Sequence, residues 1–445
     1  MTRLFFLSLA LAASGPVAAQ TPGGDGGVNG PTLASLEPAF QAVEGQVVEW
    51  RRDFHQHPEL SNRETETAAK VAAHLQSLGL EVETGVAHTG VVGVLRGGRP
   101  GATVALRADM DGLPVEERVD LPFKSTATGT YNGDVVPVSH ACGHDTHIAI
   151  LMGVAEVLAG RRDEIPGTVV FLFQPAEEGA PKGEEGGAEL MVKEGVLTRW
   201  GVDAAFALHI NSQLEAGHIG YRAGGLWAGV DDMKITVRGQ QSHGAYPWLG
   251  TDPVVTSAQI ITGLQTVVSR NVDLTENPAV VTIGSIHGGV RSNIIPEEVE
   301  MIGTVRTLST DDREMVNARI REIATQTAQA MGATAEVEIP YSASYPVTSN
   351  DADLTAASVP ALVAAAGADR VHQVPPRTGA EDFSFFAREV PGFYFVLGGR
   401  PPEVAEEDAP AHHTPDFFVS EAGLPVGVRA MAGVALAYLD AHAGN

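Results

Sequence analysis

The sequence predicts an α/β protein in which a mostly parallel mixed sheet, flanked by helices, forms a main domain that is interrupted by a smaller α+β domain. Helical and β-rich stretches alternate from about residue 31 to 222, and this alternation is typical of a parallel sheet covered by helices. The pattern changes between about 225 and 338 and resumes from about 342. We therefore assign 31–224 and 340–445 to the main domain and 225–339 to an inserted domain.

The main domain is expected to contain helices over 35–54, 64–79 and 146–159, with a closing helix over 421–442. Short runs rich in apolar and β-branched residues predict buried strands at 103–106, 168–173 and 204–208. In sheets of this kind, ligand sites lie beyond the carboxyl ends of the strands. Polar side chains that follow these three runs are therefore the first candidates for a site.

The inserted domain begins with residues 231–237, where polar and apolar residues alternate as in a half-exposed strand. A helix over 251–270, strands at 279–286 and 296–306, and a second helix over 312–331 follow. The order strand, helix, strand, strand, helix, strand predicts a two-layer α+β sandwich. Gly224 and Gly225, at the junction, are a candidate hinge.

The first 19 residues are typical of a secretory signal peptide. One positive charge precedes an apolar run from Leu4 to Ala13, and small residues at Val17 and Ala19 fit a cleavage site. The apolar run is too short for a membrane anchor, and a buried N-terminal helix is the alternative. Residues 20–30 are expected to form a flexible leader. Because no later stretch approaches the length of a membrane span, we expect an exported, soluble protein, either periplasmic or secreted.

Composition excludes several classes of partner. The chain carries 55 acidic and 29 basic residues, a net charge of −26, which disfavours binding to nucleic acid or to an anionic membrane. Its single cysteine, Cys142, excludes an internal disulfide. With 44% hydrophobic residues, the chain has enough apolar side chains for a large core without cross-links.

That cysteine lies one glycine away from His144, within a run that contains three histidines and an aspartate. Thiolate and imidazole both bind divalent metals of intermediate softness. The Cys-Gly-His spacing allows one tight turn to direct both side chains at the same ion. The sequence therefore predicts a metal site near residue 142.

Further candidate ligands follow the predicted strands. Glu177 and Glu178 come directly after 168–173, and His209 ends the run 204–208. A doublet, His412 and His413, precedes Thr-Pro, where the backbone is held extended. Taken singly, an acidic pair in a loop is more often solvated, and a lone histidine at a strand end is more often structural.

Taken together, these residues supply five ligands: Cys142, His144, Glu178, His209 and one histidine of the 412/413 pair. Five ligands exceed the need of one tetrahedral ion and fit two ions bridged by a water or hydroxide, which leaves Glu177 as a general base. Asp109 and Asp111 follow the strand 103–106 and are placed to orient metal-bound imidazoles.

Nine segments in the same order resemble the binuclear metallo-aminoacylase and carboxypeptidase superfamily, in particular its amidohydrolase branch. They are RRDFHQHPELSNRETET (51–67), RADMDGLP (107–114), SHACGHDTHIA (139–149), QPAEEG (174–179), ALHI (207–210), SHGAYPWLGTDP (242–253), GGVRSNIIPEEVEMIGTVRT (288–307), GAEDFSFF (379–386) and HHTPDFF (412–418). The resemblance runs from about Trp50 to the C-terminus. It implies a catalytic domain and a smaller lid or dimerisation domain.

The resemblance also implies residue roles. The metal ligands would be Cys142, His144, Glu178, His209 and His413, holding two divalent ions that could be Mn, Zn, Co or Ni. Glu177 would be the general base, and His243 would polarise the scissile carbonyl, often from a dimer partner. Asn293 and Arg306 would hold the substrate carboxylate. The family's second histidine in the segment after His243 is Trp248 here, which departs from the common pattern.

The resemblance implies an exported hydrolase that cleaves N-acyl amino acids, as a homodimer formed through the inserted domain. An exopeptidase acting on short peptides is the alternative, because both substrates present an amide next to a free carboxylate. A non-enzymatic ligand-binding protein is a third reading, which a missing ligand or base would favour, and none is missing. Phe383, Phe385, Phe386 and Trp248 are expected in the core rather than in an acyl pocket.

Overall fold

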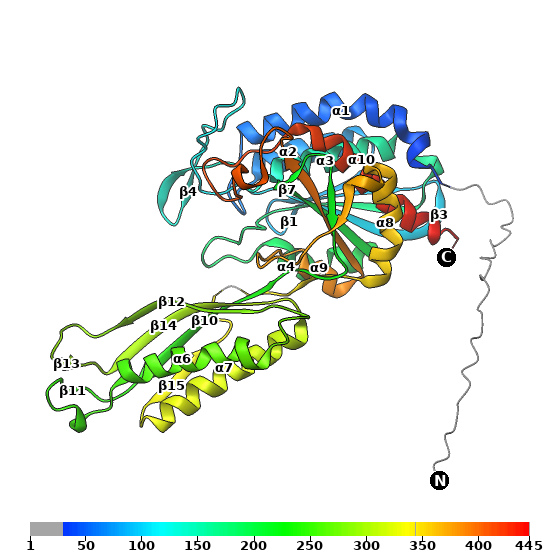
Figure 1. The fold of residues 1–445 in the computed structure, drawn as a ribbon. Coiled ribbons are helices and arrows are strands. Elements are labelled where there is room, and N and C mark those ends of the chain that lie inside the picture. The colour runs from blue at the N-terminus through cyan, green and yellow to red at the C-terminus, as the bar shows by residue number, and fades with distance from the viewer. Residues whose placement is uncertain (1–29, 343, 445) are drawn as a thin grey trace, which may run out of the picture.

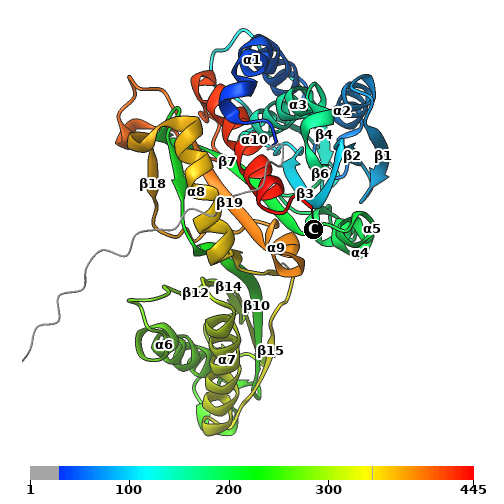
Figure 2. The same ribbon diagram turned by 90° about the vertical axis from the view of Figure 1, so that its right-hand side faces the viewer.

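The computed structural model describes residues 30–342 and 344–444. The predicted signal peptide (1–19) and all but the last residue of the predicted leader (20–30) lie outside the described residues. The described chain forms two bodies, a larger one and a smaller one that projects from one end of it (Figures 1 and 2). After the resemblance above, they are called the catalytic domain and the lid.

The catalytic domain is built on an eight-stranded mixed sheet with the order β1-β2-β6-β3-β7-β19-β8-β18. Its four central strands, β6 (Pro166–Gln174), β3 (Arg99–Asp109), β7 (Ala204–Glu215) and β19 (Gly392–Arg400), run parallel to one another. An antiparallel hairpin of β1 (Glu81–Val86) and β2 (Gly90–Arg96) extends one edge, and β8 (Ile219–Tyr221) and β18 (Val371–Gln373) extend the other. A separate hairpin joins β4 (Thr128–Tyr131) to β5 (Asp134–Pro137).

Helices cover both faces of the sheet, so both faces are buried. Successive side chains of each strand point to opposite sides and therefore enter different cores. On β6, Phe171 and Phe173 pack in one core, whereas Val170 and Leu172 pack in the other. The first core includes α1 (Leu33–Gln56), α2 (Thr65–Ser77), α3 (His144–Ala159), α8 (Ala352–Ala366) and α10 (Leu424–Ala441). The second core includes α4 (Gly187–Lys193), α5 (Val196–Trp200) and α9 (Ser384–Glu389). The predicted fold class is confirmed, with helices on both faces of a largely parallel sheet.

Helix α10 contradicts the expectation that no stretch after the signal peptide is long and apolar enough to span a membrane. Together with the preceding turn it spans Glu421–Ala441, and by length and composition it is apolar enough to cross a membrane. In the structure, 67% of this apolar window is buried, and the helix packs against α1, α3 and α8. The apolar side chains of α10 thus pack in the core of the catalytic domain.

The lid domain contains an antiparallel sheet with the order β12-β14-β10-β15, formed by β12 (Val280–Gly288), β14 (Glu298–Thr307), β10 (Gly229–Arg238) and β15 (Thr334–Glu338). Helices α6 (Pro253–Asn271) and α7 (Thr310–Ala330) lie side by side against it (Figure 2). Short strands β11 (Ser242–His243) and β13 (Ile294–Ile295) pair at the far end of the lid (Figure 1). The element order is the one expected for the inserted segment.

Two chain crossings join the domains. On the way out, β9 (Gly224–Trp227) pairs with β17 (Thr348–Asn350), and on the way back β16 (Ser344–Tyr345) pairs with β10. The two glycines that we predicted as a hinge lie in β9. A side chain on Gly225 would place its Cβ 2.2 Å from the carbonyl oxygen of Leu308, so only glycine allows this close approach.

Because the lid has a core of its own, a mutation there is expected to destabilise it without affecting the catalytic domain. Ile320 on α7 is fully buried in this core. Ile320→Ala should lower the free energy of unfolding of the lid by about 2–5 kcal/mol. Calorimetric unfolding should then show an earlier lid transition, with the metal content unchanged. Glu322→Ala, two residues further along and on the exposed face of α7, is the control, and equal shifts for both variants would contradict separate cores.

Candidate metal centre and active site

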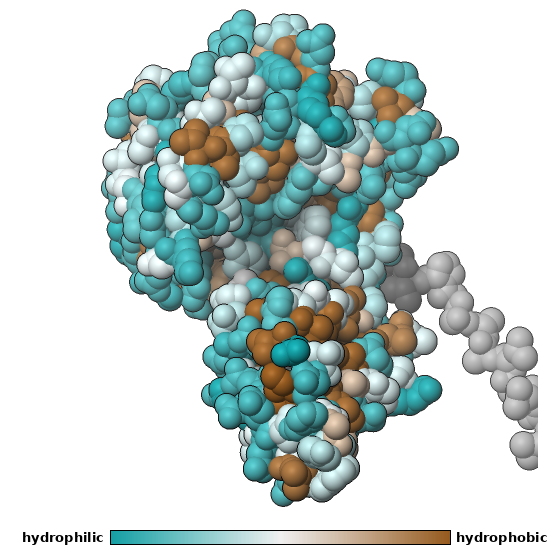
Figure 3. All heavy atoms as spheres, turned by 90° about the vertical axis from the view of Figure 1, so that its left-hand side faces the viewer, coloured by the Kyte–Doolittle hydropathy of each residue, from teal (hydrophilic) through white to brown (hydrophobic). Residues whose placement is uncertain are grey.

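The candidate site lies where the central parallel strands end. Strand β6 ends at Gln174, directly before Glu177 and Glu178, and β3 ends at Asp109. Helix α3 begins at His144, in the same region. The surface of the molecule is hollowed between the catalytic domain and the lid (Figure 3). The site therefore occupies the position that a parallel sheet favours for chemistry.

A tight turn brings the two ends of the Cys-Gly-His motif together. Gly143 has a φ of +96°, and a Cβ there would lie 2.4 Å from Cγ2 of Ile210, so the turn requires glycine. Cys142 Sγ lies 3.4 Å from Nε2 of His209 and 3.3 Å from Nε2 of His413.

The remaining predicted ligands connect to the same group. Nε2 of His413 lies 3.1 Å from Oε1 of Glu178, and Nε2 of His144 lies 4.0 Å from that same oxygen. The structure thus brings all five predicted metal ligands together. Glu177 lies beside them, with a carboxylate oxygen 3.7 Å from Nε2 of His144.

His209 does not end its strand, as we had expected. We placed it at the end of a strand, but β7 continues for six residues beyond it. The pairing with β3 ends at Ala207, whereas the pairing with β19 continues past His209. His209 therefore lies just beyond the part of β7 that pairs with β3, and this leaves its ring free to face the site.

Unpartnered atoms indicate that these residues fit a metal. Nε2 of His144 is buried and has no hydrogen-bond partner within the described part of the chain, and Oε1 of Glu178, also buried, faces Nε2 of both His144 and His413. Nδ1 of His144 donates to the carbonyl of Asp111 at 2.8 Å, and Nδ1 of His209 donates to the carbonyl of Ile210 at 2.5 Å. Each ring is thereby fixed with Nε2 available as a ligand, which is the usual arrangement of metal-bound histidines.

The charge of the site also fits a cation. Burial, together with the carboxylates of Glu178 and Glu177, raises the pKa of the Cys142 thiol well above its usual value. A thiolate at this position therefore requires a compensating positive charge. Nitrogen, sulfur and carboxylate oxygen are all present, and this donor set suits divalent ions such as Zn or Mn.

The histidine doublet divides into two different roles. Nε2 of His412 accepts a hydrogen bond from the backbone N–H of Ser212 at 3.2 Å, so its proton is on Nδ1. That Nδ1 donates to the carbonyl of Cys142 at 3.2 Å. Both nitrogens of His412 are therefore used, and His413 is left as the ligand of the pair. His147 is used in the same way, between Asp109 and the N–H of Ile210.

Asp109 and Asp111 orient different side chains of the candidate metal site. Asp109 accepts from His147 at 2.5 Å and from Arg107 at 2.6 Å, so it orients a histidine that is not a predicted ligand. Asp111 orients His144 mainly through its carbonyl, while its carboxylate accepts from the N–H of Glu178 at 3.0 Å. Although burial opposes ionisation, the charges of His144 and Arg107 hold the pKa of Asp109 well below its usual value.

A buried acidic cluster beside Glu177 was missed by sequence reasoning. Glu381 and Asp382, each 2% exposed, lie close to Glu177 and contact the guanidinium of Arg107 at 3.0 and 2.9 Å. Burial, followed by repulsion from Glu381 and other carboxylates, raises the pKa of Glu177 well above its usual value. A raised pKa suits a group that must accept a proton near neutral pH. The available signal was an adjacent acidic pair within the apolar segment 379–386.

The turn that carries Glu177 is held on three sides. Glu64, fully buried, accepts from the N–H of Ala176 at 2.9 Å, where the backbone has a φ of +52°. Asp111 holds the N–H of Glu178, and the hydroxyl of Tyr345 donates to the carbonyl of Glu177 at 3.2 Å. Tyr345 lies in β16, so the crossing from the lid directly contacts the turn that carries Glu177.

His243, predicted to polarise the carbonyl, and Asn293, predicted to bind the substrate carboxylate, lie in the lid away from this group of residues. His243 is in β11, and Asn293 is beside it, since the N–H of Gly244 donates to the carbonyl of Asn293 at 2.8 Å. Both are at the end of the lid that is remote from the catalytic domain (Figure 1). Arg306 is near the other end of β14, paired with Val230. One chain therefore does not bring His243 and Asn293 to Glu177.

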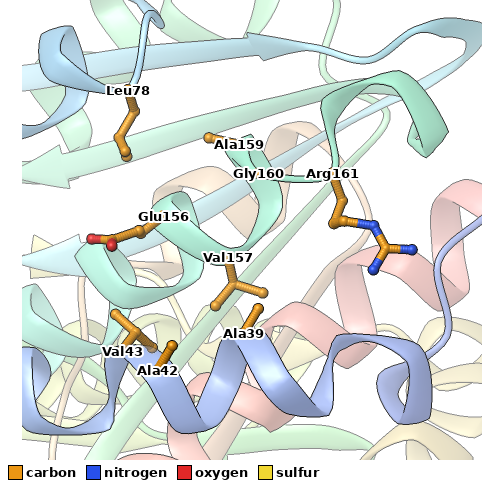
Figure 4. A pocket seen from close by; sticks show the side chains of 9 residues that line it. All are labelled: Ala39, Ala42, Val43, Leu78, Glu156, Val157, Ala159, Gly160 and Arg161. Atoms are coloured by element: carbon orange, nitrogen blue, oxygen red, sulfur yellow. The ribbon is translucent and has the colours of Figure 1, made fainter.

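The four aromatic residues that we expected in the core differ in burial. Phe383 and Phe386 are fully buried in the core, and Phe385 packs against that core. Trp248 is 73% exposed on the lid, so placing it in the core was wrong. A groove between α1 and the end of α3, bordered by Glu156 and Arg161, contains none of the predicted site residues (Figure 4).

This combination of fold, clustered candidate metal ligands and an adjacent carboxylate is what a metal-dependent hydrolase requires. Residues 105–437 match the family described as Peptidase family M20/M25/M40, and the chain belongs to that family. Its similarity to relatives supports the amidohydrolase branch.

Three relatives illustrate the range of that family. The chain is 40% identical over 407 residues to thermostable carboxypeptidase 2 of Saccharolobus solfataricus, covering 91% of this chain and 98% of the relative. It is 38% identical over 405 residues to an N-acetylcysteine deacetylase of Bacillus subtilis, covering 90% and 99%. The crystal structure of the Bacillus subtilis YXEP protein, described as a dinuclear metal-binding peptidase of the M20 family, superposes with a TM-score of 0.74. It is 34% identical and covers 90% of this chain and 99% of that chain. The chain is thus a hydrolase of amides or peptides that uses divalent metal ions.

The different roles of the two adjacent histidines can be tested by metal analysis. His413→Ala should lower the metal bound per chain, because Nε2 of His413 faces Cys142 and Glu178. His412→Asn should retain most of the metal, since both nitrogens of His412 are bonded to the backbone. Elemental analysis after dialysis against trace metal gives the result. Equal loss of metal in both variants, with unchanged unfolding temperatures, would contradict the assignment.

Proposed function

We propose that this chain is an exported hydrolase that cleaves the amide bond of N-acyl amino acids, with Glu177 as the general base. The observation that carries this proposal is the position of Glu177, which lies beside the predicted ligand His144 on one side and beside Glu381 and Asp382 on the other. A carboxylate with a raised pKa next to a metal group is what activation of water requires.

Cys142, His144, Glu178, His209 and His413 would hold two divalent ions, of which Mn, Zn, Co and Ni all suit the donor set. When bound, such ions lower the pKa of water and polarise the carbonyl. Glu177 takes one proton from the attacking water and later gives it to the leaving nitrogen. Water and amide are thereby converted into a carboxylic acid and a free amino acid.

The lid supplies the remaining groups in this proposal. Arg306, half-buried near the domain junction, would bind the substrate carboxylate, which holds the amide in position. His243 and Asn293 would act on the site of a second subunit, with His243 polarising the carbonyl, because they lie at the remote end of the lid.

A homodimer through the lid is therefore part of the proposal. Apolar side chains, brown in Figure 3, gather on the surface of this domain. The exposed apolar residues of the lid include Val254 and Val255 on α6 and Ile286 on β12. Their exposed fractions are 45%, 48% and 50%. Apolar patches of this kind on a surface mark interaction sites.

A second candidate is an exopeptidase that removes the C-terminal residue of a peptide. The similarity to a thermostable carboxypeptidase favours it, whereas the similarity to an N-acetylcysteine deacetylase favours N-acyl amino acids. Amino-acid release should be measured on N-acetyl, N-benzoyl and N-indoleacetyl amino acids and on dipeptides, with added Mn or Zn and with chelator. Chelator-sensitive cleavage of the acyl conjugates supports the proposal, and cleavage of dipeptides alone supports the exopeptidase.

Export rests on the first 19 residues, whose pattern is typical of a signal peptide. We propose that the mature protein is periplasmic or secreted. Expression of the full chain in a bacterial host, followed by fractionation and N-terminal sequencing, tests this. The expected result is an extracytoplasmic protein that begins near residue 20, and an uncleaved chain in the cytoplasm would contradict it.

The base assignment predicts a separation of metal binding from turnover. Glu177→Gln should retain the bound metal, because the predicted ligands are unchanged. It should lower kcat by about 100-fold to 10,000-fold, since the amide cannot accept the proton of water. Glu185→Gln, on the exposed loop that follows, is the control. Near-normal turnover in Glu177→Gln would exclude it as the base.

The contribution of His243 from a partner subunit predicts complementation between two inactive variants. Glu177→Gln and His243→Ala should each be nearly inactive alone. Mixed dimers contain one site with both native residues, so refolding the two together should restore about a quarter of the wild-type activity. If the mixture stays as inactive as its components while dimers form, His243 does not act across the interface.

A further inference from the structure

Arg377 is a guanidinium without a carboxylate partner close to the candidate metal centre. It follows β18, and its backbone is fixed against the domain crossing. Its N–H donates to the carbonyl of Leu226 at 2.8 Å, and its carbonyl accepts from the N–H of Ala228 at 3.0 Å. The side chain is therefore anchored on the catalytic domain, where the chain leaves for the lid.

Arg377 lacks an acidic partner although the chain has 55 acidic residues against 29 basic ones. The more deeply buried arginines, Arg51 and Arg107, each contact carboxylates. Arg377 is half-buried and its guanidinium has no ion pair with any described residue. Burial lowers its pKa from the usual value, as expected for a cation without compensation.

Trp227 provides a second unpartnered donor at the same place. The guanidinium carbon of Arg377 lies 5.5 Å from the centroid of the Trp227 ring, which fixes its position by cation–π contact. The indole N–H of Trp227 is buried and has no acceptor within the described part of the chain. Buried donors of this kind are normally satisfied, so an acceptor is missing at this position.

Trp227, on which Arg377 stacks, lies next to a predicted metal ligand. The ring of Trp227 is 5.8 Å from the ring of His209, centroid to centroid. The two unpartnered donors thus border the cleft in which the proposed reaction takes place.

We propose that Arg377 and the indole N–H of Trp227 form a subsite that binds a carboxylate of the substrate. This inference rests on the proposed function and adds a specificity-determining group on the catalytic domain to Arg306 on the lid. A guanidinium and an N–H supply charge-assisted hydrogen bonds to an anionic oxygen. The carboxylate could be the α-carboxylate of the amino acid or one at the far end of the acyl chain.

Paired substrates distinguish these two sources. N-acetyl-leucine and its amide differ only in the α-carboxylate, and N-succinyl-leucine and N-butyryl-leucine differ only at the end of the acyl chain. Arg377→Gln should raise KM by about 10-fold to 100-fold for the substrates that carry the relevant carboxylate. It should leave kcat and the matched neutral substrate nearly unchanged. Arg370→Gln, an exposed arginine nearby, is the control.

Two further variants separate recognition from a general structural effect. Trp227→Phe keeps the ring beneath the guanidinium but removes the N–H, so it should raise KM for the same substrates by a smaller factor. Arg377→Lys keeps the charge but loses the planar fork, and should give an intermediate KM. Unfolding temperature and metal content should match the wild type in all of them.

Binding without turnover gives a readout that does not depend on catalysis. Calorimetric titration of N-acetyl-leucine and N-succinyl-leucine into metal-loaded Glu177→Gln, with and without Arg377→Gln, measures affinity directly. Weaker binding of either ligand in the double variant supports the subsite and identifies its carboxylate. Equal effects on all four substrates, or no effect on any, would overturn the subsite while the proposed function stands. A wild-type enzyme that cleaves none of the substrates overturns the proposed function instead.

Discussion

Arg107 is the charge on which the candidate site depends. Its guanidinium, 2% exposed, lies within 3.0 Å of carboxylate oxygens of Asp109, Glu381 and Asp382 and also donates to Gln174. These contacts join the ends of β3 and β6 to the segment before α9. Although burial favours the neutral form, the three carboxylates raise its pKa well above the usual value. Without this cation, three buried carboxylates beside Glu177 would lack compensation, and their repulsion would disrupt the site.

The strands of the catalytic domain position the side chains of the candidate site, and the crossing from the lid contacts the same region. Parallel strands deliver Asp109, Glu177 and His209 to one edge of the sheet, and Gly143 allows Cys142 and His144 to face the same space. The hydrogen bond from Tyr345 to the carbonyl of Glu177 links the domain crossing to this edge. A change in lid orientation would therefore act directly on the turn that carries Glu177.

Much of this site could be predicted because its residues follow recognisable strands. The Cys-Gly-His motif and the Glu177–Glu178 pair stand at strand ends or in tight turns, where local sequence determines geometry. Glu64, Glu381 and Arg377 could not be predicted, because their roles arise from contacts between segments far apart in the chain. The location of His243 also required the structure, since the sequence does not show which end of the lid faces the catalytic domain. The predictions for His209 and Trp248 were wrong in detail because strand length and exposure depend on neighbouring elements.

The central claim is that Cys142 is a metal ligand at the edge of the sheet, in a group that includes His144, Glu178, His209 and His413. X-ray absorption spectroscopy of the metal-loaded protein tests it most directly. For a zinc-loaded sample, this account predicts one sulfur scatterer at about 2.3 Å together with nitrogen and oxygen ligands, and loss of the sulfur in Cys142→Ser. A spectrum with only nitrogen and oxygen ligands, unchanged in Cys142→Ser, would contradict the account.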